Sequence, residues 1–162
     1  MIFIKVSILF SLLICLEPKV DLKKAESTDV LENVIQLSGS NIRKSGDNYL
    51  IDIIAKNINN NIAGLQFEII GKNYSIVEAS GGLADSYGFN FYPGSGGVIL
   101  AFSLEGKIIP PIEKRAKSAN EPLITLEIKK NTKESADLML KTIIAGEKGI
   151  KLESSFQPLS IK

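Results

Sequence analysis

Four carboxylates in the middle of the chain, Glu68, Glu78, Asp85 and Glu105, are candidates for acid–base chemistry. Paired carboxylates can hydrolyse glycosidic bonds, one as the acid and the other as the base or nucleophile. Each of the four falls where a solvent-facing strand position or a loop would carry a charge in any case. The sequence also has no histidine, which removes the commonest general base and the commonest metal ligand. We therefore expect no catalytic residue and a protein that is not an enzyme.

Metal, cofactor and phosphate sites are not predicted either. The single cysteine, Cys15, excludes an internal disulfide and a thiolate zinc site. The run Gly94-Ser95-Gly96 lacks the lysine and the strand–loop–helix setting of a phosphate loop, so a hairpin turn is favoured. Asn57 and the asparagines at 59–61 could offer oxygens to calcium, but asparagines between strands are more often turn formers. We expect no metal ion and no cofactor.

Aromatic residues crowd into one short segment, at Tyr87, Phe89, Phe91 and Tyr92. On a strand, positions 87, 89 and 91 share one face and Tyr92 points the opposite way. Exposed aromatic rings bind sugars or protein partners, whereas buried rings build a core. The core interpretation is favoured for Phe89 and Phe91. Tyr87 and Tyr92, together with Asp85, are the candidate binding residues, and the absence of tryptophan argues against a flat platform for crystalline cellulose.

The segments that must position these residues have an apolar period of two. Three segments show it most clearly, and their shared faces are Ala63, Leu65, Phe67 and Ile69; Val98, Leu100, Phe102 and Leu104; and Ile124, Leu126 and Ile128. Such alternation predicts strands with one buried and one solvent-facing side, as in an antiparallel sandwich. Further strands are expected at 34–37, 49–57, 74–79, 89–92, 138–145 and 156–161.

Turn residues separate these strands, most clearly the glycine pair at 81–82 and the run at 93–97. About nine short strands at this spacing predict an all-β fold, an antiparallel jelly-roll β-sandwich. Helical structure is expected to be sparse. Residues 83–87 could form one helical turn, and residues 112–121 a short helix or a charged loop.

The N-terminal segment Met1–Leu16 predicts a secretory signal. Lys5 is its only charge, and the apolar run 6–16 has the length of a signal-peptide core but is short for a membrane span. A buried first strand or helix is the less favoured alternative. We place the signal peptide and the start of a linker at 1–27, and the β-sandwich domain at 28–162.

A secreted or cell-envelope location, periplasmic or extracellular, follows from this signal. Lipidation of Cys15 is an open alternative, although the bulky Ile14 stands where that motif has a small residue. The net charge is +1 with both signs mixed, so no strong field would attract nucleic acid. Membrane contact is expected only through the signal segment or a lipid anchor at Cys15.

Several strings of core and turn residues carry a family resemblance. They are Gly64-Leu65-Gln66-Phe67-Glu68-Ile69, Gly81-Gly82-Leu83-Ala84, Gly88-Phe89, Ile99-Leu100-Ala101-Phe102-Ser103, Gly106 through Pro110, and Leu123-Ile124-Thr125-Leu126-Glu127-Ile128 followed by 138–146. Together they resemble cohesin-like domains, which belong to the same broad sandwich group as several carbohydrate-binding modules. The resemblance covers residues 34–161. Its one local departure is the longer, basic segment 111–122 where many relatives have a short hairpin.

The resemblance implies a jelly-roll sandwich of about nine strands on a secreted or surface protein. Cohesins bind calcium-loaded dockerin modules through one sheet face, and relatives bind polysaccharide or act as assembly modules. We therefore expect a non-catalytic recognition module for an extracellular protein partner, of the kind found in dockerin-type assembly. The alternative is a carbohydrate-binding module that recognises polysaccharide through Tyr87 and Tyr92.

Overall fold

The computed structural model describes residues 34–56, 58–115 and 121–161. The expected signal segment, the linker and Cys15 lie outside the described residues, as does Asn57. In the part of the chain that is described, no helix is long and apolar enough to cross a membrane.

Strands dominate the described chain, as the period of two predicts. The strands are β1 (Ile35–Ser45), β2 (Asn48–Lys56), β3 (Ile62–Ile69), β4 (Tyr74–Ser80), β5 (Asn90–Pro93), β6 (Val98–Phe102), β7 (Ile124–Lys130), β8 (Asp137–Leu138), β9 (Leu140–Gly146), β10 (Lys151–Leu152), β11 (Ser154–Gln157) and β12 (Leu159–Ser160). The helical pieces are α2 (Gly82–Ser86) and the short turns η1 (Ser95–Gly97), η2 (Ile112–Lys114) and η3 (Glu147–Gly149). The expected helical turn at 83–87 is α2, and the first residues of 112–121 form η2.

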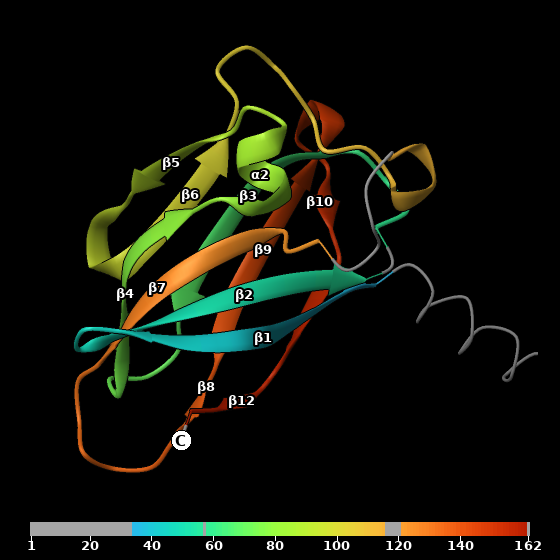
Figure 1. Cartoon of the computed structure of the whole chain (residues 1–162). Helices are drawn as coiled ribbons and strands as arrows, with labels where there is room; N and C mark the ends of the chain where they lie inside the picture. The colour runs from blue at the N-terminus through green and yellow to red at the C-terminus, as the bar shows by residue number, and fades with distance from the viewer. Residues whose placement is uncertain (1–33, 57, 116–120, 162) are drawn as a thin grey trace, which may run out of the picture.

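Two five-stranded sheets lie face to face, in the orders β11-β1-β2-β7-β4 and β10-β9-β3-β6-β5 (Figure 1). A small third sheet pairs β12 with β8. The predicted all-β sandwich is confirmed, and the described strand pairs are antiparallel with one exception. That exception is β1 with β11, which run parallel from Ile35 opposite Ser154. Strands β1 and β11, from near the two ends of the described residues, therefore lie side by side in one sheet and run in the same direction.

Two expected strands are divided in the structure. The segment 138–145 becomes β8 and β9 because Met139 leaves the ladder and its carbonyl accepts a hydrogen bond from Ile70 N–H at 2.9 Å. The segment 156–161 becomes the end of β11 and β12, with Pro158 between them. Proline has no N–H to donate, which explains the break at that position.

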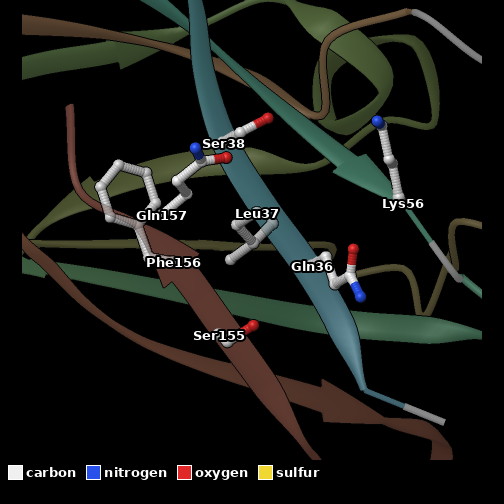
Figure 2. Close-up of a pocket in the computed structure, with 7 residues that line it drawn as sticks. All are labelled: Gln36, Leu37, Ser38, Lys56, Ser155, Phe156 and Gln157. Atoms are coloured by element: carbon white, nitrogen blue, oxygen red, sulfur yellow. The ribbon is translucent and has the colours of Figure 1, made fainter. Parts of the chain in front are cut away.

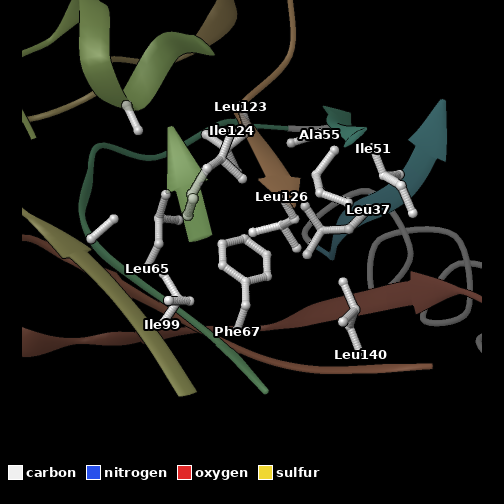
Figure 3. Packing of buried hydrophobic residues seen from close by; sticks show 14 of the residues in the cluster. Leu37, Ile51, Ala55, Leu65, Phe67, Ile99, Leu123, Ile124, Leu126 and Leu140 are labelled. Carbon is white, nitrogen blue, oxygen red and sulfur yellow. The ribbon is translucent and has the colours of Figure 1, made fainter. Parts of the chain in front are cut away.

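The core lies between the two sheets and is built from the expected alternating residues. On β7, the side chains of Ile124, Leu126 and Ile128 are fully buried. On β3, Leu65 and Phe67 point inward, and Phe67 reaches the centre of the cluster shown in Figure 3. These residues supply the apolar area that holds the sheets together.

The expected buried face of β6 is wrong. Val98, Leu100 and Phe102 do share a face, but it is the outer one, while Ile99 and Ala101 are buried at 4% and 0% exposure. The register explains the reversal. Residues directly opposite on neighbouring strands share a face, and the inward Phe67 and Leu65 of β3 stand opposite Ile99 and Ala101. The bulkier set of β6 side chains is thereby placed on the outside of the sandwich.

The aromatic segment is only partly a strand. Tyr87 is the residue that ends α2, and β5 begins three residues later at Asn90. Phe89 is buried, and Phe91 is half-buried against the core. The core interpretation of the two phenylalanines is therefore confirmed. Tyr92 follows Phe91 on β5 and points to the opposite, outer face.

Candidate functional site

An apolar surface covers the outside of the β10-β9-β3-β6-β5 sheet. The strand register places its outward residues in three rows across the sheet: Lys151, Ala145, Gly64, Phe102 and Asn90; Ile143, Gln66, Leu100 and Tyr92; and Lys141, Glu68 and Val98. We call these rows the apolar outer face. Apolar side chains predominate in the first two rows, and the charged members are Lys151 at the end of the first row and Lys141 and Glu68 in the third.

Two aromatic side chains from neighbouring strands pack together on this face. Tyr92 of β5 stacks on Phe102 of β6 with ring centroids 4.7 Å apart and planes inclined by 26°. Such offset stacking fixes both rings and adds to the stabilisation that comes from burial. Leu100 stands directly opposite Tyr92 in the ladder, so the three side chains form one continuous apolar patch.

A depression opens beside this patch, with a volume of about 390 Å³. Its floor is Gly64 of β3, and Phe102, Ile143 and Ala145 contribute to its walls. A methyl carbon built on Gly64 would lie 3.6 Å from Cβ of Ala145 and 3.9 Å from Cβ of Phe102. Because Gly64 has no side chain, it leaves a hollow between its row neighbours Ala145 and Phe102.

Charged side chains border the depression without entering its centre. Lys141 pairs with Glu68 at 3.1 Å, and Lys151 pairs with Glu153 at 3.4 Å. Lys148, in η3, lines the depression directly. The turn that holds Lys148 is closed by a 2.7 Å hydrogen bond from Gly146 N–H to the carbonyl of Ile150. An apolar centre with a polar border is the composition of a protein-binding surface.

The residues predicted from sequence as binding residues do not form one site. Asp85 and Tyr87 line a second depression of about 430 Å³, together with Lys107 and Ile108. Tyr92 lies on the apolar outer face instead. Tyr87 also packs against the core, which limits the ring area that it offers to a ligand.

The candidate carboxylates are likewise dispersed. Glu68 lies on β3 and is paired with Lys141, whereas Glu78 lies on β4 in the other sheet. Glu105 pairs with Lys107 at 2.7 Å, and this hydrogen bond lowers the pKa of the Glu105 carboxyl. Among the described residues, no group of three or more histidine, cysteine or acidic side chains could hold a metal ion.

The opposite outer face, on the β11-β1-β2-β7-β4 sheet, is mostly polar, although Leu50 and Ile54 of β2 also lie on it. On this face, Asp52 accepts two hydrogen bonds from Arg43 at 2.8 and 2.9 Å and one from Thr125 at 2.8 Å. Asn41, at the bulge of β1, donates a further bond to Asp52 at 2.8 Å. The hydrogen bonds from Arg43, outweighing burial, lower the pKa of the Asp52 carboxyl to about 2. These hydrogen bonds join β1, β2 and β7. We call Asp52, Arg43, Thr125 and Asn41 together the Asp52 clamp.

A smaller hollow of about 230 Å³ lies where β11 meets β1. Figure 2 shows its polar side chains, among them Gln36, Ser38 and Gln157, with the Phe156 ring beside them. None of the residues that line it is a carboxylate or a paired nucleophile. Lys56 is the one ionisable residue among those that line this hollow.

Sequence reasoning missed the residues that make the apolar outer face distinctive, namely Gly64, Leu100, Phe102, Ile143 and Ala145. One signal was available. All five residues of 98–102 are apolar, both the odd-numbered and the even-numbered ones. One of these two sets had to face outward, whichever set was buried. An apolar strand face that lies outside a sandwich and remains uncovered marks an interaction surface.

Comparison with known proteins shows the fold. No protein-family model matches the chain, and no curated protein matches it significantly. Among solved structures, the third ScaB cohesin of R. flavefaciens, in complex with a group 1 dockerin, is 17% identical with a TM-score of 0.54, over 79% of this chain and 93% of that chain.

Two further cohesins give similar values. The sixth cohesin from scaffoldin B of Acetivibrio cellulolyticus, in complex with a mutant dockerin, is 8% identical with a TM-score of 0.50, over 80% of this chain and 98% of that chain. A non-cellulosomal cohesin from the archaeon Archaeoglobus fulgidus is 9% identical with a TM-score of 0.52, over 78% and 88%. The chain is thus a cohesin-like domain in its fold, as the sequence resemblance predicted.

Proposed function

We propose that this chain is a non-catalytic recognition module that binds a protein partner of dockerin type through the apolar outer face. The observation that carries the proposal is the uncovered row Ile143, Gln66, Leu100 and Tyr92, which runs across β9, β3, β6 and the edge strand β5. Two of the solved cohesins that share the fold are in complex with dockerins, which supports this class of partner.

The geometry of the face suits a partner that packs flat against side chains. Strands β3 and β6 are paired with a neighbour on both sides, so their backbone groups are already engaged in the ladder. A partner strand therefore has no free ladder to join at the centre of the sheet. Binding would come from a few apolar anchors, Leu100, Phe102 and Tyr92, with the charged residues Lys141, Glu68 and Lys151 at the border of the contact.

The carbohydrate alternative receives less support. It requires Tyr87 and Tyr92 to act on one ligand, but the two tyrosines lie in different surface features. The ring of Tyr92 is also occupied on one side by Phe102. No separate observation favours a sugar over a protein on the apolar outer face.

The proposal includes a secreted or cell-envelope location. Its support is the apolar segment Met1–Leu16 with its single charge and the polar stretch that follows. Lipidation of Cys15 would keep the module at the membrane surface, whereas cleavage beyond it would release the module. Metabolic labelling with a radioactive fatty acid, compared between the chain and Cys15→Ser, decides between these two forms.

The test is a binding experiment with the tagged chain and the secreted and envelope proteins of the source organism. Half of the sample contains a calcium chelator, and retained proteins are identified by mass spectrometry. We expect a partner that carries a dockerin-like segment and is released by the chelator. Retention of the chain on polysaccharide, with no protein recovered, would overturn the proposal in favour of sugar binding.

A further inference from the structure

We propose that the depression over Gly64 is the specificity pocket of the apolar outer face, and that it accepts a methyl-bearing aliphatic side chain that lies next to a carboxylate in the partner. This inference rests on the proposed function, because it names the feature of a protein partner that the face would recognise. It concerns Gly64, Ala145, Phe102 and Lys148.

The shape of the hollow sets the first requirement. A carbon atom at the Cβ position of Gly64 would make ordinary van der Waals contact with Ala145 on one side and Phe102 on the other. A carbon atom bonded to Gly64 therefore has room there, and because Gly64 carries no Cβ the hollow is open down to the backbone of β3. A partner's methyl group in van der Waals contact with the Gly64 backbone would stand above the Cβ position and pack against Phe102, Ile143 and Ala145, which is how an anchor residue contributes to an interface.

The lining of the hollow sets the second requirement. Leu100, Phe102, Ile143 and Ala145 present apolar atoms around the floor. Gln66 is the one amide side chain in the lining, so a polar side chain inserted between the four apolar residues would lose more hydrogen bonds to water than it could regain, at a cost in affinity. The occupant is therefore aliphatic.

The charge at the border sets the third requirement. Lys148 is the one charged residue among those that line the depression. The neighbouring Lys141 and Lys151 are already paired with Glu68 and Glu153, whereas the described residues hold no ion pair for Lys148. An acidic group beside the aliphatic anchor would complement this charge.

The test uses a displayed library of random peptides selected on the immobilised chain. The selected peptides are measured against Gly64→Leu, which fills the hollow, and against Ser38→Leu, a control on the polar outer face of β1. The backbone at Gly64 is outside the left-handed region, and one added carbon fits there, so Gly64→Ala serves as a milder second variant. Thermal melting followed by circular dichroism confirms that each variant is folded.

We expect selected peptides to share a leucine, isoleucine, valine or methionine next to aspartate or glutamate. Their binding should fall by about tenfold or more on Gly64→Leu, fall less on Gly64→Ala and stay unchanged on Ser38→Leu. Lys148→Gln should weaken binding by about threefold in low salt and by less in high salt. Failure to select any peptide that depends on Gly64, or selection of Gly64-dependent peptides without the aliphatic and acidic pair, would overturn the proposal.

The failure of this proposal can be told apart from failure of the proposed function. Suppose that a natural partner no longer binds Leu100→Glu but binds Gly64→Leu as tightly as the unaltered chain. That result would support docking through the apolar outer face and would overturn the specificity pocket at Gly64. A partner that binds both variants unchanged would overturn the docking face itself.

Discussion

Tyr92 and Phe102 stack across the boundary between β5 and β6, with ring centroids 4.7 Å apart, on the outside of the sandwich. Phe102 also lines the depression over Gly64, so its ring lies between the tyrosine and the hollow. The stack thus defines one wall of the candidate binding surface and ties the edge strand β5 to the interior of its sheet.

The stack should be measurable as a coupling energy. The double variant Tyr92→Ala/Phe102→Ala should lose less free energy of unfolding than the sum of the losses in the two single variants. The difference, which is the coupling energy, should be about 0.5–1.5 kcal/mol. Tyr92→Phe keeps the ring and should lose little stability. Urea denaturation of the single and double variants gives the coupling, and strictly additive losses would show that the rings do not stabilise each other.

The Asp52 clamp predicts how stability depends on pH. The folded state lowers the pKa of Asp52 from 3.8 to about 2, because Arg43, Thr125 and Asn41 donate hydrogen bonds to the charged carboxylate. Its contribution is therefore complete above about pH 4 and is lost as the pH falls toward about 2. That contribution is on the order of 2 kcal/mol, since one pKa unit corresponds to about 1.4 kcal/mol.

Asp52→Asn tests this dependence. The variant should be less stable than the unaltered chain near neutral pH, and the difference should shrink as the pH falls through the acidic range. The free energy of unfolding in urea, measured as a function of pH, gives both values. A difference that stays constant between about pH 4 and about pH 2 would contradict the assigned pKa.

The glycine pair before α2 gives a matched test of backbone packing. Both residues have positive φ, 65° at Gly81 and 67° at Gly82, but only Gly82 is crowded. A Cβ on Gly82 would lie 2.5 Å from the carbonyl oxygen of Pro122, whereas nothing lies within 4 Å of one on Gly81. Two hydrogen bonds hold α2 at this place, from Leu83 N–H to Pro122 and from Ala84 N–H to Leu123.

We therefore expect Gly81→Ala to cost about 1 kcal/mol, from the left-handed backbone alone. Gly82→Ala should cost about 3 kcal/mol or more, because the start of β7 must also move. Thermal and urea denaturation give both values. Equal losses from the two substitutions would mean that α2 does not pack closely on the segment before β7.

The sequence predicted most strand positions because every second side chain of each strand had to be buried, which leaves an apolar period of two. It failed for β6, where both alternations are apolar and only the pairing of Phe67 with Ile99 decides which set points inward. That pairing joins residues far apart in the chain, so no local pattern contains it. The parallel contact of β1 with β11 escaped prediction for the same reason.

The candidate site was harder to predict than the fold. Tyr92 was selected for its aromatic ring and does lie on the apolar outer face. Tyr87 was selected as the other tyrosine of the aromatic segment, together with the nearby Asp85, but the end of α2 places both in a different depression. Gly64 gave no signal at all, since a glycine in a strand becomes a pocket only when larger neighbours from β6 and β9 surround it.

The most direct test of the account compares matched charge substitutions on the two outer faces. Leu100→Glu places a carboxylate in the centre of the apolar outer face, and Ile54→Glu makes the same change on the outer side of β2 in the opposite sheet. Each tagged variant is incubated with the secreted and envelope proteins of the source organism beside the unaltered chain. We predict that the unaltered chain and Ile54→Glu retain the same partner. The affinity of Leu100→Glu for that partner should be lower by about thirtyfold or more. Equal retention by all three proteins would contradict docking through this face.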